Sequence, residues 1–152
     1  MTTMTQTNVQ VYQVFIRATP EQIWEAITKP EFTAKYFHGS LVDSTFEPGA
    51  TYNSWSPDRS KLWVDGIVED ADPPHRLSHT WRALYDPETA AEEASRVTWE
   101  IEPLDGGVSK LTVVHDRLEG APKTAASVSG AGWMHVLSGL KTLLETGEPL
   151  FG

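Results

Sequence analysis

Residues 75–84 read "HRLSHTWRAL", and their side chains alternate in the manner of a β-strand. The odd positions carry mostly apolar side chains, and the even positions between them carry polar ones. The odd set is Leu77, His79, Trp81 and Ala83, and the even set is Ser78, Thr80 and Arg82. On the apolar side, His79 and Trp81 are candidates for core filling, for the wall of a ligand pocket or for part of a catalytic site.

Two further stretches repeat this alternation, "RVTWEIE" at 96–102 and "KLTVVHD" at 110–116. Their apolar positions are Val97, Trp99 and Ile101 in the first stretch and Leu111, Val113 and His115 in the second. The positions between them are mostly polar, which is typical of an antiparallel sheet covered on one face. A register shifted by one residue would bury Glu100 and Glu102 without partners, and that cost excludes it. If the three strands are neighbours, cross-strand pairing brings the two histidines and the two tryptophans into one band.

The N-terminal part predicts one strand followed by two short helices. The stretch "VQVYQVFIRA" at 9–18 alternates like a strand. In "TPEQIWEAITKP" at 19–30, Thr19 can cap a helix, Gln22 completes a capping box, and Pro30 disfavours helical geometry at the residue before it. A helix is therefore predicted to end near Thr28, and a second short helix is predicted over "PEFTAKYF" at 30–37.

The C-terminal part predicts a long amphipathic helix. In "SVSGAGWMHVLSGLKTLLETGEP" at 127–149, apolar residues share one stripe, and Gly147 and Pro149 end the pattern. The stripe consists of Trp133, Val136, Leu137, Leu140, Leu143 and Leu144. No other apolar stripe in the sequence is as long, so we expect this helix to cover the apolar face of the sheet.

The middle of the chain has turn signals about every ten residues, which favours an antiparallel meander of short strands. The acidic segment "YDPETAAEEA" at 85–94 has no strand pattern, and Asp86 followed by Pro87 is able to start a single helical turn. We predict an exposed loop there, which would also form a rim of whatever the sheet encloses.

Composition excludes several classes of protein. The 152 residues fit one domain, which commonly has ~100–200 residues. The 12 Lys and Arg against 21 Asp and Glu give a net charge of −9, which argues against nucleic acid and anionic membrane as partners. The absence of cysteine excludes disulfides and thiol catalysis. The start "MTTMTQTN" is unlike a signal peptide, and no apolar run reaches the ~18 residues of a spanning helix, so we expect a cytoplasmic protein.

Four stretches, in this order, resemble the activator of heat-shock protein 90 ATPase C-terminal-domain-like family of the START-like, or SRPBCC, superfamily. They are "ATPEQIWEAITKPEF" at 18–32, "GIVEDADPPHRLSHTW" at 66–81, "VTWEIEPLDGGVSKLTVVH" at 97–115 and "GWMHVLSGLKTLLETG" at 132–147. The resemblance implies one START-like domain over 9–147, with flexible termini at 1–8 and 148–152. It implies an α+β helix-grip fold, in which a curved antiparallel sheet wraps around a long C-terminal helix. Two short helices follow the first strand, and a cavity lies between sheet and helix.

The sequence departs from the family in two places. After the second helix the family often has a tryptophan where this chain reads "KYFHG", with Phe37 as the substitute. The eukaryotic co-chaperones that named the family carry a separate N-terminal module for chaperone contact, and nothing before residue 9 corresponds to it. The family name is therefore not expected to describe the function of this chain, and a chaperone partner is not expected.

Several kinds of chemistry are weakly supported. Metal binding is not expected, because His79 and His115 make only two ligands where zinc needs three or four, and no inward Asp or Glu joins them. His38, His75 and His135 fall at loop or outward positions and are expected in solvent. Nucleophilic catalysis lacks both a cysteine and a G-x-S-x-G motif. Acid–base catalysis by His79 or His115 stays open, beside the alternative that both are hydrogen-bonded wall residues.

We predict a protein that binds a small hydrophobic or amphiphilic molecule in an internal cavity, without a cofactor. The predicted ligand-binding residues are His79, Trp81, Trp99, Val113, His115, Trp133, Val136, Leu137 and Leu140. An aromatic wall suits a planar ligand, because indole faces offer stacking area and indole N–H groups fix polar edges.

Two alternative functions remain. One is a cyclase- or hydrolase-type enzyme that uses a cavity histidine as acid or base. The other is a chaperone-associated interaction module, which would expose an apolar patch on the outer face of the sheet. The polar residues predicted on that face argue against the second alternative. A homodimer is compatible with the sequence.

Overall fold

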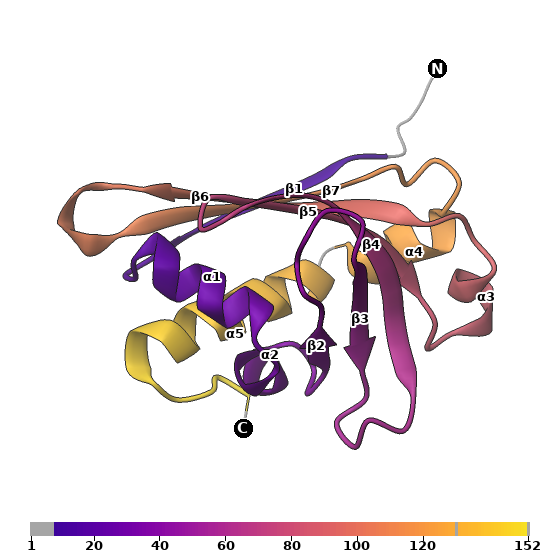
Figure 1. Cartoon of the computed structure of the whole chain (residues 1–152), viewed down its shortest axis with the longest axis horizontal. Helices are drawn as coiled ribbons and strands as arrows, with labels where there is room; N and C mark the ends of the chain where they lie inside the picture. Colours follow the sequence, from indigo (N-terminus) through magenta and orange to yellow (C-terminus); the bar gives the residue numbers. More distant parts are fainter. Residues whose placement is uncertain (1–7, 130, 152) are drawn as a thin grey trace.

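The computed structural model describes residues 8–129 and 131–151, and its elements follow the predicted order (Figure 1). The strands are β1 (Gln10–Ile16), β2 (Leu41–Asp43), β3 (Thr51–Trp55), β4 (Leu62–Asp72), β5 (Arg76–Ala83), β6 (Ser95–Pro103) and β7 (Ser109–Asp116). The α-helices are α1 (Pro20–Thr28), α2 (Pro30–Tyr36), α3 (Pro87–Ala90), α4 (Pro122–Val128) and α5 (Ala131–Thr146), and a 3₁₀ turn, η1 (Asp105–Gly107), joins β6 to β7.

The strands form one seven-stranded antiparallel sheet in the order β1-β7-β6-β5-β4-β3-β2. Strands β1, β7, β6 and β5 lie as a roof over α1 and α5, and the sheet then bends so that β4 and β3 turn down beside the helices (Figure 1). The predicted α+β helix-grip fold is therefore confirmed. At the bend, a cavity lies between the down-turned strands and the start of α5.

The predicted faces of the sheet are confirmed. Strand β6 pairs with β5 on one side and with β7 on the other, so the three strands are neighbours. Val97 lies opposite both His79 and His115, which places the two histidines in one row across the sheet. All the positions predicted to face inward on these strands are buried.

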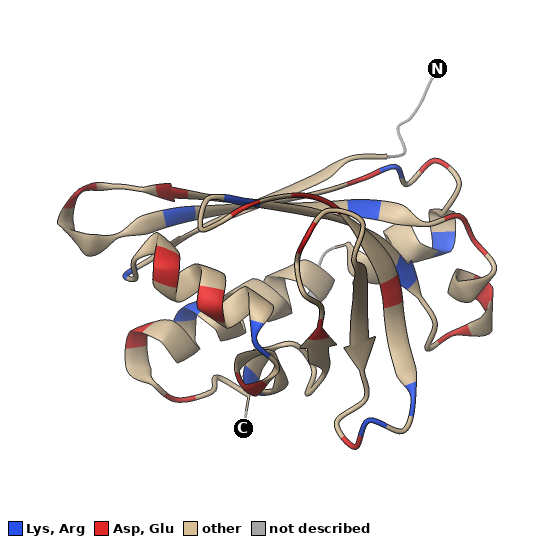
Figure 2. Cartoon of the chain, in the orientation of Figure 1, with Lys and Arg blue, Asp and Glu red and all other residues tan. Residues whose placement is uncertain are grey.

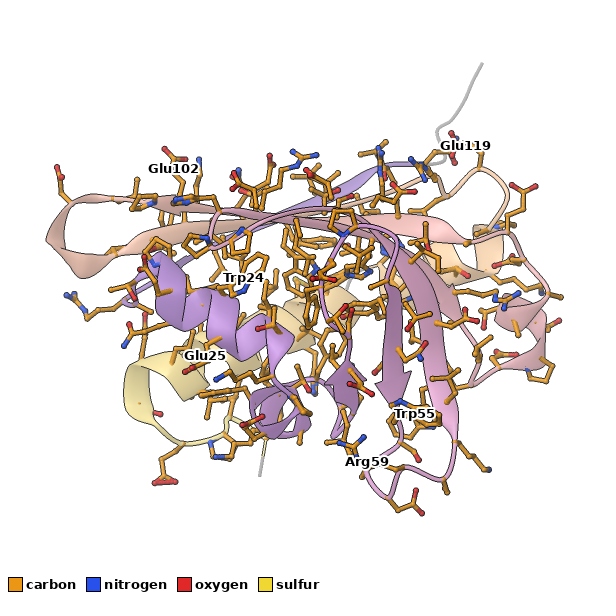
Figure 3. The ribbon with its side chains drawn as sticks, viewed as in Figure 1. Trp24, Glu25, Trp55, Arg59, Glu102 and Glu119 are labelled. Carbon is orange, nitrogen blue, oxygen red and sulfur yellow. The ribbon has the colours of Figure 1, made fainter. Side chains whose placement is uncertain are left out.

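The outer face of these strands is polar and holds ion pairs. Arg96 pairs with Asp116, and Arg76 pairs with Glu100 at 3.3 Å between side-chain nitrogen and oxygen. Charged residues lie along the strands, in the loops and on the helices (Figure 2). Glu102 points away from the helices (Figure 3). Exposed apolar side chains of the sheet include Val11 and Phe15 on the edge strand β1 and Ile67 on β4.

The predicted helix signals at the N-terminal side are confirmed. The backbone N–H of Gln22 donates to Thr19 Oγ1 at 3.2 Å, and Gln22 Oε1 accepts from the backbone N–H of Thr19 at 2.9 Å, which completes the capping box. Helix α1 ends at Thr28 and α2 begins at Pro30, as predicted. The Tyr36 hydroxyl donates to a backbone carbonyl of α1 at 2.8 Å, so the two helices are held together.

The later helices agree with the sequence in part. Asp86 caps the single turn α3, as its pattern predicted, and the predicted stripe of α5 packs in the core. Helix α4 was not predicted, although Pro122 stands in its first turn, where proline is favoured. Of the termini predicted to be flexible, residues 1–7 and 152 lie outside the described residues.

The close approach of β4 and β5 at Gly66 predicts an effect on stability. A Cβ atom added to Gly66 would come within 2.0 Å of the backbone carbonyl oxygen of Thr80 on β5, so the strands would have to move apart. We expect Gly66→Ala to lower the free energy of unfolding by about 2–4 kcal/mol, as measured by urea denaturation. The control Ile67→Ala changes the exposed neighbouring residue and should cost less than about 1 kcal/mol. Equal small losses in both variants would contradict the close approach of these two strands.

Candidate functional site

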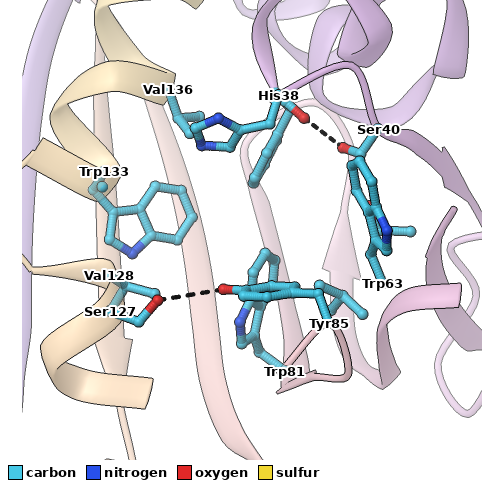
Figure 4. A pocket seen from close by; sticks show the side chains of 13 residues that line it. His38, Ser40, Trp63, Trp81, Tyr85, Ser127, Val128, Trp133 and Val136 are labelled. Carbon is cyan, nitrogen blue, oxygen red and sulfur yellow. Dashed lines mark hydrogen bonds between the residues drawn. The ribbon is translucent and has the colours of Figure 1, made fainter. Parts of the chain in front are cut away.

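A cavity of about 520 Å³ lies where the sheet bends away from the start of α5 (Figure 4). Phe37 and His38 line it from the segment after α2, and Trp63 and Trp81 line it from β4 and β5. The opposite wall comes from α4 and α5 and includes Trp133. The volume is that of a small-molecule site, which commonly has ~300–1,000 Å³.

The wall is aromatic with a few neutral polar groups. Serine hydroxyls stand at three places around it: Ser40, Ser54 and Ser127. None of the lining residues is an Asp, Glu, Lys or Arg. The wall therefore offers stacking surface and hydrogen bonds, but no fixed charge of either sign that would neutralise an ionic ligand.

Two side chains stand at the exposed side of the cavity. Tyr85 comes from the loop that we predicted to be a rim, and its hydroxyl lies 3.4 Å from Ser127 Oγ, as Figure 4 shows. The His38 ring stacks on His135 of α5, with 4.6 Å between ring centroids. Partial burial lowers the pKa of His38, and the neighbouring His135 lowers it further.

The structure places the nine predicted binding residues at two different depths. Trp81, Trp133 and Val136 line the cavity. The other six are buried in the core but do not line it: His79, Trp99, Val113, His115, Leu137 and Leu140. The two groups differ because the alternation of a strand predicts which residues face inward. It does not predict which inward residues are covered by α5 and which border the cavity.

His79 is enclosed by hydrogen bonds within the protein. Its side chain is fully buried and stacks on Tyr52, with 3.7 Å between ring centroids. The indole Nε1–H of Trp99 donates to His79 Nε2 at 3.0 Å. His79 Nδ1 lies 2.9 Å from the backbone carbonyl oxygen of Thr80, which can only accept, so Nδ1 carries the proton. Both ring nitrogens are therefore in use, and the imidazole is neutral.

His115 has the same kind of enclosure with the opposite tautomer. The indole Nε1–H of Trp133 donates to His115 Nδ1 at 3.1 Å, so in the neutral ring the proton is on Nε2. That N–H faces Ser95 Oγ at 2.7 Å, and the serine hydroxyl donates to the backbone carbonyl of Trp81 at 3.1 Å. This chain of bonds links helix α5 to three strands of the sheet.

Burial favours the neutral form of both rings. It lowers the pKa of His79 to about 4, against a weaker opposing effect of its bond to Thr80. Burial, together with a smaller effect of the neighbouring His79, lowers the pKa of His115 to about 3. Neither ring has a free nitrogen or contacts the cavity, so this geometry does not favour the predicted acid–base role, which stays untested.

Several wall residues were missed by sequence reasoning. His38 was predicted to be in solvent, and although exposed it lines the cavity. Trp63 was assigned no role, because the downward bend of β4 is a tertiary feature. Tyr85 lies in the segment predicted as a rim, but it was not named as a wall residue. Phe37 had a usable signal, since it stands where the family often has tryptophan, and it stacks on Trp81 with 5.9 Å between centroids.

Within residues 8–129 and 131–151, no group of three or more His, Cys, Asp or Glu side chains is placed to hold a metal ion. No helix in the described part of the chain is long and apolar enough to cross a membrane.

The two buried histidines predict a loss of stability in mild acid. In the unfolded chain each histidine has a pKa of ~6.5, whereas burial holds the folded pKa far lower, so unfolding takes up protons below that pH. The free energy of unfolding should therefore fall between pH 6.5 and 5, approaching ~1.4 kcal/mol per pH unit for each histidine. Denaturant titrations across this range measure the slope.

Histidine variants show which side chains cause the pH dependence of the free energy of unfolding. His115→Gln should remove one buried histidine's share of it, and a smaller share belongs to His38, whose pKa is also lowered. His75→Gln, at an exposed turn, should leave the slope unchanged. A slope that is flat in the wild type, or one that His115→Gln does not alter, would contradict the assignment of neutral buried imidazoles.

Comparison with known proteins gives the family of this chain and solved structures with a similar fold. The family described as Activator of Hsp90 ATPase homolog 1-like protein matches residues 17–145. No curated protein matches the sequence significantly. A protein from Mesorhizobium loti has a similar solved structure, with 24% identity and a TM-score of 0.72 over 90% of this chain and 96% of its own.

Two further solved structures share the fold. DynU16, a putative protein in the dynemicin biosynthetic locus, is 22% identical with a TM-score of 0.73, and the match covers 95% of this chain but 49% of DynU16. This chain thus spans about half the length of DynU16. The Aha1 dimer from Colwellia psychrerythraea is 16% identical with a TM-score of 0.71, and the match covers 91% of this chain and 97% of that one. Because the family match spans most of the sequence, the chain belongs to the family of Activator of Hsp90 ATPase homolog 1-like proteins, within the START-like superfamily.

Proposed function

We propose that this protein binds a small, uncharged, largely planar molecule in the cavity beside α5. The observation that carries the proposal is the wall of that cavity, in which indole and phenyl rings alternate with serine hydroxyls and no lining residue is an Asp, Glu, Lys or Arg. Aromatic faces stabilise planar ligands by stacking, and a few neutral hydroxyls fix their orientation.

The charge of the ligand follows from the same wall. A carboxylate or an ammonium group placed in the cavity would lose its hydration without gaining a partner of opposite charge, which is costly. The serine hydroxyls and the Tyr85 hydroxyl can serve carbonyl, hydroxyl or ether groups instead. A neutral aromatic compound with a few oxygen atoms fits these conditions.

The relatives are compatible with this proposal at a general level. DynU16 is a protein of a biosynthetic locus, which makes a small-molecule ligand plausible for this fold. Against the chaperone alternative, the outer face of β5, β6 and β7 carries ion pairs. We further propose one domain over 9–147, a cytoplasmic location and self-association, the last because a related Aha1 forms a dimer.

Titration with the neutral fluorescent probe N-phenyl-1-naphthylamine tests the proposal. Its fluorescence rises in an apolar site, and we expect saturable binding with one site per chain. The variant Ser127→Trp places an indole at the cavity from an exposed position of α4 and should weaken binding at least about tenfold, or ~1.4 kcal/mol.

The neighbouring residue provides the matched control. Ala126→Trp adds the same side chain to the exposed position just before Ser127, which does not line the cavity, and it should leave the affinity unchanged. Thermal unfolding checks that both variants are folded. Absence of saturable binding in the wild type, or equal weakening by both substitutions, would contradict the proposal.

A further inference from the structure

Three buried tryptophans meet around the inner face of the sheet, and they differ in one respect. The indole nitrogens of Trp99 and Trp133 donate to His79 and His115. The indole nitrogen of Trp81 is buried and has no hydrogen-bond partner among the residues that the structure describes. Leaving a buried donor unpaired costs ~1–3 kcal/mol, so such a group in a native fold needs an explanation.

Trp81 is fixed in place by its neighbours. Its side chain stacks on Phe37, meets His115 edge to face at 6.1 Å between ring centroids, and lies 6.2 Å from Trp133. The residue is 5% exposed. The ring is therefore held on several sides, and it cannot relieve its unpaired N–H by turning out into solvent.

Trp81 also lines the cavity, whereas Trp99 is buried and does not. We infer that the Trp81 indole N–H selects the ligand by donating a hydrogen bond to a neutral acceptor, such as a ketone or quinone oxygen, on a planar aromatic molecule. This inference rests on the proposed function and adds a specificity-determining residue to it. A neutral acceptor is favoured over a carboxylate, because the wall has no Lys or Arg to balance a charge.

Ligand contact with this nitrogen requires movement of the wall, since the nitrogen is shielded from solvent in this structure. Tyr85 is suited to such movement. It is 52% exposed, and its hydroxyl is held by one long hydrogen bond, of 3.4 Å, to Ser127. Figure 4 shows this bond at the cavity wall.

Two probes of matched shape test the inference: 9-fluorenone, which carries a carbonyl acceptor, and fluorene, which lacks it. The affinities of the wild type and of Trp81→Phe for each probe are measured by displacement of N-phenyl-1-naphthylamine. We expect Trp81→Phe to reduce the ratio of fluorenone affinity to fluorene affinity by about 3- to 10-fold, as loss of one hydrogen bond implies. The ratio removes effects of altered cavity size, because these act on both probes.

Trp63→Phe is the control, since it shortens another tryptophan of the same wall and should leave the ratio unchanged. A second readout is the indole N–H signal of Trp81 in a ¹⁵N–¹H NMR spectrum, assigned by its absence in Trp81→Phe. Fluorenone should move this signal downfield and fluorene should not.

The outcomes separate the two proposals. Binding of both probes with the same ratio in the wild type and in Trp81→Phe, or no downfield shift with fluorenone, would overturn the role of Trp81 and leave the binding function standing. Failure of the wild type to bind either probe would overturn both.

Discussion

The hydrogen bond from Trp133 to His115 is the constraint on which much of this structure depends. It joins the long helix α5 to strand β7 inside the core, and Ser95 extends the connection to β6 and β5. Trp99 and His79 form a second pair of the same kind within the sheet. A buried imidazole is tolerated when both of its nitrogens have hydrogen-bond partners. In each of these pairs the imidazole also accepts a hydrogen bond from a buried indole N–H, which would otherwise be unpaired. Buried hydrogen bonds thus attach helix α5 to the inner face of the sheet.

This arrangement separates the structural histidines from the cavity. The packed middle of the sheet, around His79 and His115, gives rigidity, and the open end beyond it is lined by Trp81, Trp63 and Phe37. Trp133 takes part in both, because its indole nitrogen binds His115 while its ring lines the cavity. The cavity wall is therefore supported by buried hydrogen bonds of the core, which would preorganise it for the proposed ligand.

The sequence predicted the fold well because its strongest signals are local or periodic. The capping box at Thr19, the alternation of three strands and the stripe of α5 each leave a pattern in a short stretch of residues. The candidate site was predicted less well, because parity separates inner from outer residues but does not say how far along a strand the helix packs. The alternation correctly placed His79 and His115 on the inner face, but neither residue lines the cavity. Trp63 and His38 reach the cavity through the bend of the sheet and the path of the chain after α2, which no short pattern encodes. For Tyr85 the sequence predicted only that its segment forms a rim.

The central claim is that the inner-face histidines are neutral parts of the scaffold, and that one of them, His115, holds Trp133 at the cavity wall. Long-range ¹⁵N NMR of the imidazole rings tests it most directly, because the nitrogen shifts report protonation and tautomer. At pH 6.5, His79 should be the Nδ1–H tautomer and His115 the Nε2–H tautomer, and neither should titrate as the pH is lowered to 5. Titration of either ring near pH 6.5, or the opposite tautomers, would contradict this account.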